Sequence, residues 1–262
     1  MVNVRKNLQV AGLVAALLGV LGAGPVAAVV LIDDDFANSG HYWIWTTGFD
    51  GDGEVGYSPD AQNLELRSAS TMGATTWMKT VRQYDTASGS RLALRVRCMA
   101  GEPMGPQDDS FWGFQRTVGG QDYSIGFLAT WIDGQGAVLL ARARAGAQSA
   151  AFTVPSPSWS QSVDYRIDVQ EGSATFFVNG SQVWAVTSFA VPQGLLDVRL
   201  EKTSPGRARA LSVDSVALDE SWLRSRYLLS VGGPEKQGGL RAADEGGRAE
   251  ATWGTIKAAY RD

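Results

Sequence analysis

The segment "DYRIDVQEGSATFFVNGSQVWAVT" (residues 164–187) decides the fold class of this 262-residue chain. In its first part, apolar residues at 165, 167 and 169 alternate with polar ones, the period of a strand with one buried and one solvated face. The tetrapeptide "QEGS" is a turn, and "ATFFVNGSQVWAV" divides at Asn179-Gly180 into two further strands. Asn-Gly is the strongest short-range hairpin signal. The segment therefore predicts three antiparallel strands in succession.

The chain up to Leu218 continues in the same manner. Gly and Asp residues separate short apolar stretches, as in "DGDG" at 50–53 and "DGQG" at 133–136. No helical period of convincing length occurs before residue 219, so the chain predicts an all-β sandwich or barrel. Besides the three strands above, strands are expected at Val30–Phe36, Asn63–Arg67, Thr75–Val81, Arg91–Cys98, Ser110–Arg116, Tyr123–Thr130, Ala137–Arg144, Ala151–Val154, Leu195–Glu201 and Ala208–Leu218.

The first 28 residues have the pattern of a secretory signal peptide. Arg5 and Lys6 precede an apolar run, a Gly/Pro break follows it, and the small residues around Ala28 suit cleavage after that position. This predicts an exported protein without a further membrane span. The alternative is an uncleaved N-terminal anchor, since residues 8–32 are long enough to cross a bilayer. The Gly/Pro break favours cleavage.

Charge and cysteine content exclude other classes. The formal net charge is −4 and no basic run occurs, so nucleic acid is not an expected partner, because such binding rests on phosphate neutralisation. Cys98 is the only cysteine, so an internal disulfide is excluded and the fold depends on its core. Cys98 continues an alternation of apolar residues, which predicts a buried thiol.

The C-terminal part differs in character. Residues 219–250 are rich in Gly and charge and predict a largely flexible linker. In residues 251–262, Trp253, Ile256 and Tyr260 fall on one side of a short helix, which is too short to be stable alone in water. Two interpretations stay open: the helix docks on the sandwich, or it is a recognition segment for a protein partner.

Four stretches carry a family resemblance: the opening strand "DDDF", the strand "NLELRS", the Tyr-x-Ile…Phe-x-Val-Asn-Gly hairpin, and the closing strand "LSVDSVAL". Together they resemble the concanavalin A-like jelly roll, the fold of laminin-G-like domains, legume-type lectins and family 16 glucanases. The resemblance implies an antiparallel two-sheet β-sandwich over residues 29–218. It also implies a non-catalytic, carbohydrate-binding module, although function on this fold varies independently of the fold.

Catalytic patterns are largely missing from the sequence. The family 16 glucanases carry a Glu-x-Asp-x-x-Glu strand, whose carboxylates act across the glycosidic bond, and no such spacing occurs here. His41 is the only histidine, and there is no G-x-S-x-G elbow. The sequence therefore favours binding over catalysis. Two alternatives stay open: a polysaccharide-active hydrolase or lyase, and a structural or adhesive envelope protein.

Aromatic and arginine side chains are the candidate ligand contacts. Flat aromatic faces beside planar polar groups suit sugar rings, and arginines suit acidic or polyhydroxylated ligands. The arginines of the strand around residue 95 share one face, which we expect to lie on the same sheet as Trp112 or Gln115. The alternative to ligand contact is that the tryptophans pack in the core and that the arginines form a solvated face. The candidates are Trp77, Arg91, Arg95, Arg97, Trp112, Gln115 and Trp131.

The resemblance also implies a possible structural calcium ion where the first and last strands meet. Jelly rolls of this kind use Asp side chains and backbone carbonyls there, and calcium takes six to eight oxygens. The candidate ligands are Asp214 and one of Asp33 or Asp35. The alternative is that these are acidic strand ends only.

Overall fold

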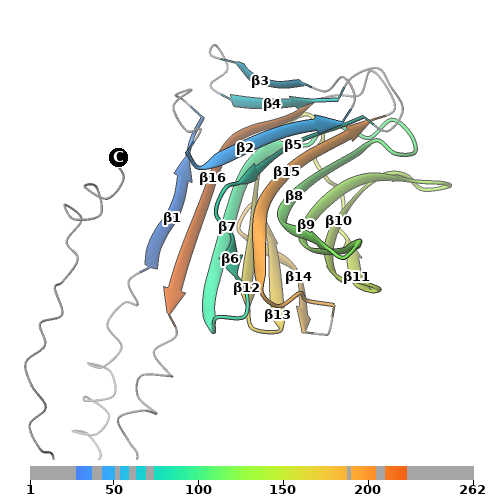
Figure 1. The fold of residues 1–262 in the computed structure, drawn as a ribbon. Coiled ribbons are helices and arrows are strands. Elements are labelled where there is room, and N and C mark those ends of the chain that lie inside the picture. Colours follow the sequence, from blue (N-terminus) through green and yellow to red (C-terminus); the bar gives the residue numbers. More distant parts are fainter. Residues whose placement is uncertain are drawn as a thin grey trace, which may run out of the picture. The chain divides into compact units, whose positions relative to one another are not determined.

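A computed structural model describes residues 28–36, 43–50, 54–58, 63–68, 74–187, 190–204 and 210–222. Residues 1–27 of the predicted signal peptide (1–28), residues 223–250 of the predicted linker (219–250) and the predicted C-terminal helix at 251–262 lie outside these ranges, as does His41. The described residues form sixteen strands and no helix (Figure 1). Within them, no helix is long and apolar enough to cross a membrane.

The strands form two eight-stranded antiparallel sheets, here called sheet A and sheet B. Sheet A has the order β14 (Ser181–Thr187), β13 (Ser173–Val178), β12 (Val163–Gln170), β7 (Ser90–Met99), β16 (Leu211–Trp222), β4 (Asn63–Arg67) and β3 (Glu54–Ser58), and β1 (Ala28–Asp34) also pairs with β16. Sheet B has the order β11 (Gln148–Thr153), β10 (Gly136–Ala145), β9 (Gln121–Ile132), β8 (Asp109–Val118), β15 (Leu195–Ser204), β5 (Ala74–Thr80) and β2 (Trp45–Asp50), and β6 (Tyr84–Asp85) pairs with β15.

The predicted all-β sandwich is confirmed, and so is the succession of three strands that decided it. β12, β13 and β14 pair in sequence, and the turn residues Asn179 and Gly180 have φ of 48° and 77°. Both angles are positive, as a type I′ hairpin turn requires. Three strands, β2, β3 and β6, were not predicted. β16 runs on to Trp222, so the last strand extends past the expected end at Leu218.

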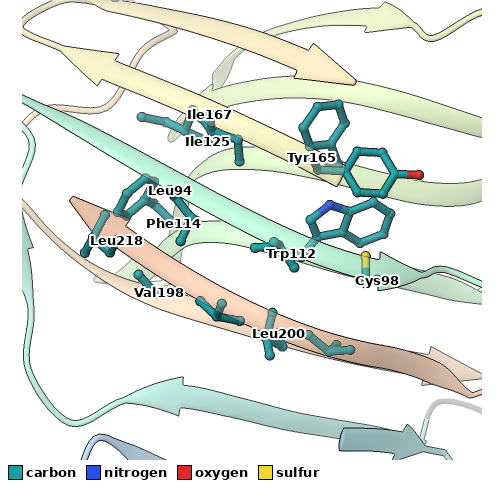
Figure 2. Close-up of a cluster of buried hydrophobic side chains, with 14 of the residues drawn as sticks. Leu94, Cys98, Trp112, Phe114, Ile125, Tyr165, Ile167, Val198, Leu200 and Leu218 are labelled. Carbon is teal, nitrogen blue, oxygen red and sulfur yellow. The ribbon is translucent and has the colours of Figure 1, made fainter. Parts of the chain in front are cut away.

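The core lies between the two sheets and is built by alternation along each strand. Trp112 of sheet B packs on Tyr165 of sheet A (Figure 2). Phe127 of sheet B also packs on Tyr165, and the ring centroids are 4.8 Å apart in both pairs. Cys98 is fully buried beside them, which confirms the predicted buried thiol, and burial raises its pKa well above the usual value. The thiol is therefore held in its unreactive, protonated form.

One ion pair lies inside the sandwich. The Lys202 ammonium donates to the Asp108 carboxylate at 2.6 Å and to the Ser110 hydroxyl at 3.1 Å. The other Asp108 oxygen accepts the backbone N–H of Met104 at 2.8 Å. Burial lowers the pKa of Lys202, and the hydrogen bond to Asp108 opposes this shift. The pair ties the loop before β8 to strand β15.

Candidate functional site

Of the tryptophans predicted to contact a ligand, some lie on the core side of sheet B and one lies on its outer side. Trp112 is fully buried, so its side chain serves the core and cannot offer a face to a ligand. Trp131 lies at the end of β9, half-buried and opposite Ala137, on the core side of the strand by alternation with Phe127. Trp77 and Gln115 lie on the opposite side of sheet B, which faces away from the core.

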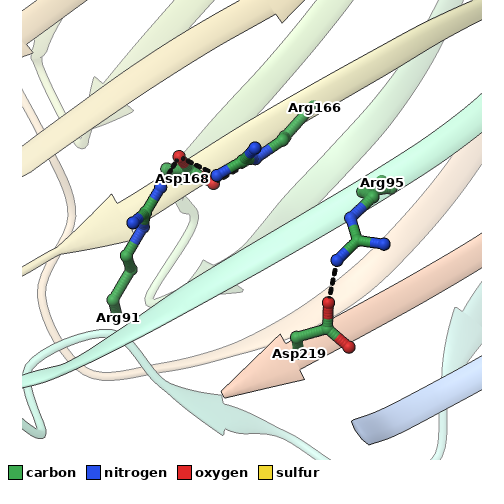
Figure 3. A network of polar contacts seen from close by, with 5 residues as sticks. All are labelled: Arg91, Arg95, Arg166, Asp168 and Asp219. Atoms are coloured by element: carbon green, nitrogen blue, oxygen red, sulfur yellow. Dashed lines mark hydrogen bonds and ion pairs between the residues drawn. The ribbon is translucent and has the colours of Figure 1, made fainter. Parts of the chain in front are cut away.

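The predicted arginine row lies on the outer face of sheet A. Arg91 and Arg166 converge on Asp168, and Arg95 pairs with Asp219 (Figure 3). The expectation that the row shares a sheet with Trp112 and Gln115 is wrong, because β7 and β8 belong to different sheets. The alternation that placed these arginines on one face was correct, but the sequence does not specify which strands pair.

The third member of the row is also paired. Arg97 lies 3.4 Å from carboxylate oxygens of both Asp164 and Asp214. Each arginine of the row therefore has a carboxylate partner within its own sheet, and none of these charges has to be balanced by a ligand.

The predicted calcium ligands are not gathered into a metal centre by the described residues. Asp214 pairs with Arg97 as above, and Asp33 and Asp35 are exposed. The buried carboxylate of this region is Asp34, which accepts the indole N–H of Trp45 at 2.8 Å and the backbone N–H of Phe36 at 2.9 Å. Within the described ranges, no group of three or more His, Cys, Asp or Glu side chains could hold a metal ion. Calcium stays a prediction.

The outer face of sheet B presents a tryptophan ring that lies flat over a glycine. Trp77 on β5 is opposite Gly48 on β2, and a Cβ at position 48 would lie 2.2 Å from the indole Cζ2. The Lys79 ammonium is 5.7 Å from the ring centroid and the Arg199 guanidinium carbon 5.1 Å. Strand glycines mark close approach of another group, which here is the ring.

A second ring repeats this arrangement two strands away. Phe111 on β8 covers Gly126 on β9, where a Cβ would lie 2.6 Å from the ring Cε2. The Arg142 guanidinium carbon is 5.9 Å from the Phe111 centroid. Gly126 is opposite Gly113 of β8, so two strand glycines lie side by side on this face.

Most cations of this face have carboxylate partners. The Lys79 ammonium is 3.7 Å from Asp197, Arg199 Nε is 2.6 Å from Glu201, and Arg144 is 3.7 Å from Asp122. Phe111 is itself buried, so the face combines one partly exposed aromatic surface, that of Trp77, with hydrogen-bonding groups fixed in ion pairs. Such a surface can bind a ring that has one apolar side and a polar rim.

Arg142 differs from these cations. Its Nη2 is 3.5 Å from the Ser124 hydroxyl, while its Nε is buried and has no partner among the described residues. Burial lowers the pKa of Arg142, as does Arg144, whereas the charge of Asp109 is the largest of the influences that raise it. This guanidinium is thus partly desolvated without a direct counter-charge.

Sequence reasoning missed Arg142 and Arg199, and it missed the buried Phe111 ring beside Arg142. The available signal was glycine inside predicted strands, at positions 113 and 126, because an isolated strand glycine indicates close approach of another group.

No known protein family matches the sequence, and neither does any curated protein. Solved structures do match. The Emp47p carbohydrate recognition domain gives a TM-score of 0.52 at 10% identity, covering 76% of this chain and 97% of that one. Peanut lectin gives 0.53 at 11% identity, covering 74% and 98%. A β-1,3-1,4-glucanase (lichenase) from a mouse hindgut metagenome gives 0.51 at 14% identity, covering 71% and 97%. The chain has the concanavalin A-like jelly-roll fold, as its sequence indicates.

Proposed function

We propose that this chain is an exported carbohydrate-binding module that holds a glycan on the outer face of sheet B without cleaving it. The observation that carries the proposal is the Trp77 ring, which lies flat over Gly48 with the cations of Lys79 and Arg199 5.7 and 5.1 Å from its centroid. The apolar side of a sugar ring stacks on such a surface, and the hydroxyls at its rim meet the neighbouring charged groups.

The comparisons support a glycan as the ligand class, since two of the similar structures are a carbohydrate recognition domain and a lectin. Binding without cleavage rests on the sequence, which lacks the Glu-x-Asp-x-x-Glu strand. Export rests on the predicted signal peptide at residues 1–28. A polysaccharide-active enzyme is the competing function, and the lichenase likeness is the observation in its favour.

The test is retention of the full-length chain on insoluble polysaccharides and on a glycan array, with reducing ends assayed in the same tubes. Trp77→Ala is expected to lower retention about tenfold or more, as loss of a central aromatic anchor does. Arg95→Ala is the matched control, because Arg95 is an exposed side chain on the outer face of the other sheet.

Each alternative outcome is informative. New reducing ends would make the protein an enzyme. Equal loss for Trp77→Ala and Arg95→Ala would remove sheet B as the binding face. Retention that disappears with EDTA and returns with calcium would support the predicted metal, whereas retention unaffected by EDTA would leave calcium without a role in binding.

A further inference from the structure

A row of outward-facing residues crosses sheet B in register: Lys79, Arg199, Gly113, Gly126 and Arg142. Neighbouring strands are about 4.8 Å apart, so the backbones of Arg199 and Arg142 are about 14 Å apart with the two glycines between them. Both glycines are buried, and the absence of a Cβ at Gly126 leaves room for the Phe111 ring, which lies beside Arg142.

The two arginines of this row differ in charge balance. Arg199 Nε donates to Glu201 at 2.6 Å. Arg142, by contrast, has no carboxylate within 4.0 Å in the part of the chain that the structure describes, and its nearest polar partner is the Ser124 hydroxyl at 3.5 Å. A half-buried cation without a direct counter-ion is costly to keep. Among the cations of this face, Arg142 is therefore the one whose pairing with an external anion is expected to contribute most to the binding free energy.

An orphaned acceptor lies on the same face. Asp109 shares the outward side of β8 with Phe111 by alternation, and its Oδ1 is buried without a hydrogen-bond partner in the described residues. The Nε of Arg142 is likewise a buried, unpartnered donor. Buried polar atoms of this kind call for a partner, because leaving one unsatisfied costs the full desolvation penalty.

We propose that the outer face of sheet B recognises an acidic sugar. Its anionic group, a carboxylate or a sulfate, binds the Arg142 guanidinium, and one of its hydroxyls donates to Asp109. Guanidinium presents a rigid fork of donors that matches an anionic oxygen pair, which favours this ligand over a neutral sugar. This inference rests on the proposed function, since it names the ligand class for the same face.

The test compares matched charged and uncharged polymers: polygalacturonate with its methyl ester, and dextran sulfate with dextran. The full-length chain is expected to bind at least one charged polymer about tenfold more tightly than its uncharged counterpart, because a hydrogen bond to a charged group is worth that much. The first pair isolates a carboxylate and the second a sulfate. A preference for one pair alone identifies the anionic group.

Arg142→Gln is expected to abolish the preference for the charged polymer over its uncharged counterpart. Arg144→Gln is the matched control, because Arg144 lies on the same face of β10 and already has Asp122 as a partner. Asp109→Asn is expected to weaken binding to both members of a pair. Thermal unfolding of each variant shows that it is folded, and Arg142→Lys, which keeps the charge, is expected to retain part of the preference.

Equal binding to charged and uncharged polymers would overturn the acidic-sugar inference and leave the proposed function standing. So would an equal loss for Arg142→Gln and Arg144→Gln. Failure to bind any of the four polymers or any glycan on the array would overturn both. If Arg142→Gln does not fold, the salt dependence of the wild-type chain tests the inference instead. The preference for the charged polymer over the uncharged one must fall as salt rises from about 0.05 to 0.5 M, because screening weakens the ion pair.

Discussion

The outer faces of sheets A and B both carry rows of cations, but the two faces hold their cations differently. On sheet A, Arg91, Arg95 and Arg97 have side chains 41%, 58% and 52% exposed, and each has a carboxylate partner within the sheet. On sheet B, Arg199 is only 23% exposed, and it lies over the Trp77 ring as well as beside Glu201. Sheet A thus balances the charges of these three arginines in contact with water, whereas sheet B packs Arg199 against a ring. Sheet A holds one arginine in the second way: Arg166 is 5.0 Å from the Phe177 ring centroid, as well as beside Asp168.

This difference shows why a row of arginines in a sequence does not by itself locate a binding face. Exposed ion pairs contribute little energy and offer a ligand nothing that water does not. A guanidinium packed on a ring is partly desolvated and fixed in place, so it can distinguish between ligands. The following predictions test this contrast, in order of decreasing effect.

The largest effect is expected inside the sandwich, where charge is removed from water altogether. Asp108→Ala leaves the Lys202 ammonium buried without its carboxylate and is expected to lower the free energy of unfolding by about 3–5 kcal/mol. Urea unfolding measures this loss. Replacing both partners, as Asp108→Leu with Lys202→Met, is expected to recover much of it. A loss below about 1 kcal/mol for the single variant would mean that the site is hydrated.

The next largest effect is expected from replacing a strand glycine by alanine, which should destabilise sheet B more than sheet A. In Gly126→Ala on sheet B, the new Cβ would lie 2.6 Å from the Trp112 carbonyl oxygen and from the Phe111 ring. The strain is expected to cost about 1–3 kcal/mol of unfolding free energy. Gly56→Ala on sheet A is the control, since the nearest atoms there are 3.9 Å away. Equal destabilisation in thermal melts would contradict a special packing role for Gly126.

A smaller effect on stability, but a clear one on binding, is expected at Gly48. In Gly48→Ala the new Cβ would lie 2.2 Å from the indole Cζ2, so the Trp77 ring must move away from position 48. The clash involves the far end of a side chain, so the cost in unfolding free energy is expected to stay below about 1 kcal/mol. Glycan retention is expected to fall about tenfold, as for Trp77→Ala. Unchanged retention would show that the flat ring is not the binding surface.

The smallest effect is expected on sheet A. Asp219→Asn removes the partner of Arg95 and is expected to change the free energy of unfolding by about 0–1 kcal/mol, because the arginine is exposed. Denaturant unfolding at low and at high salt measures it, and the difference is expected to vanish at high salt. A loss comparable to that of Asp108→Ala would erase the contrast between surface and interior pairs.

Much of the fold could be predicted from the sequence where alternation was strong. The strand at Asn63–Arg67 and the Asn179-Gly180 hairpin are observed as expected. β2 was missed because only Trp45 of its six residues is buried, so the strand has no period of two. β6 has two residues, too few for any pattern.

The candidate site was predicted less well than the fold. Trp112 was chosen and its neighbour Phe111 was not, because residues 110–114 of β8 are buried on both sides and alternation cannot tell core from outer face. Arg142 and Arg199 are distant in sequence from the rings of Phe111 and Trp77. They lie near these rings only because their strands pair within sheet B. Pairing depends on contacts between distant residues, which a periodicity along one strand does not contain.

The pairing of β1 with β16 has a mechanical consequence. Ala28 is opposite Ser221, so the outer ends of the first and last described strands lie side by side. Tension between these two ends pulls along the inter-strand hydrogen bonds, which run perpendicular to antiparallel strands, and so loads them one pair after another from Ala28 to Asp34. The sandwich is therefore expected to begin peeling from this corner at low force. The first element to yield belongs to sheet A, while the proposed glycan face on sheet B is still intact.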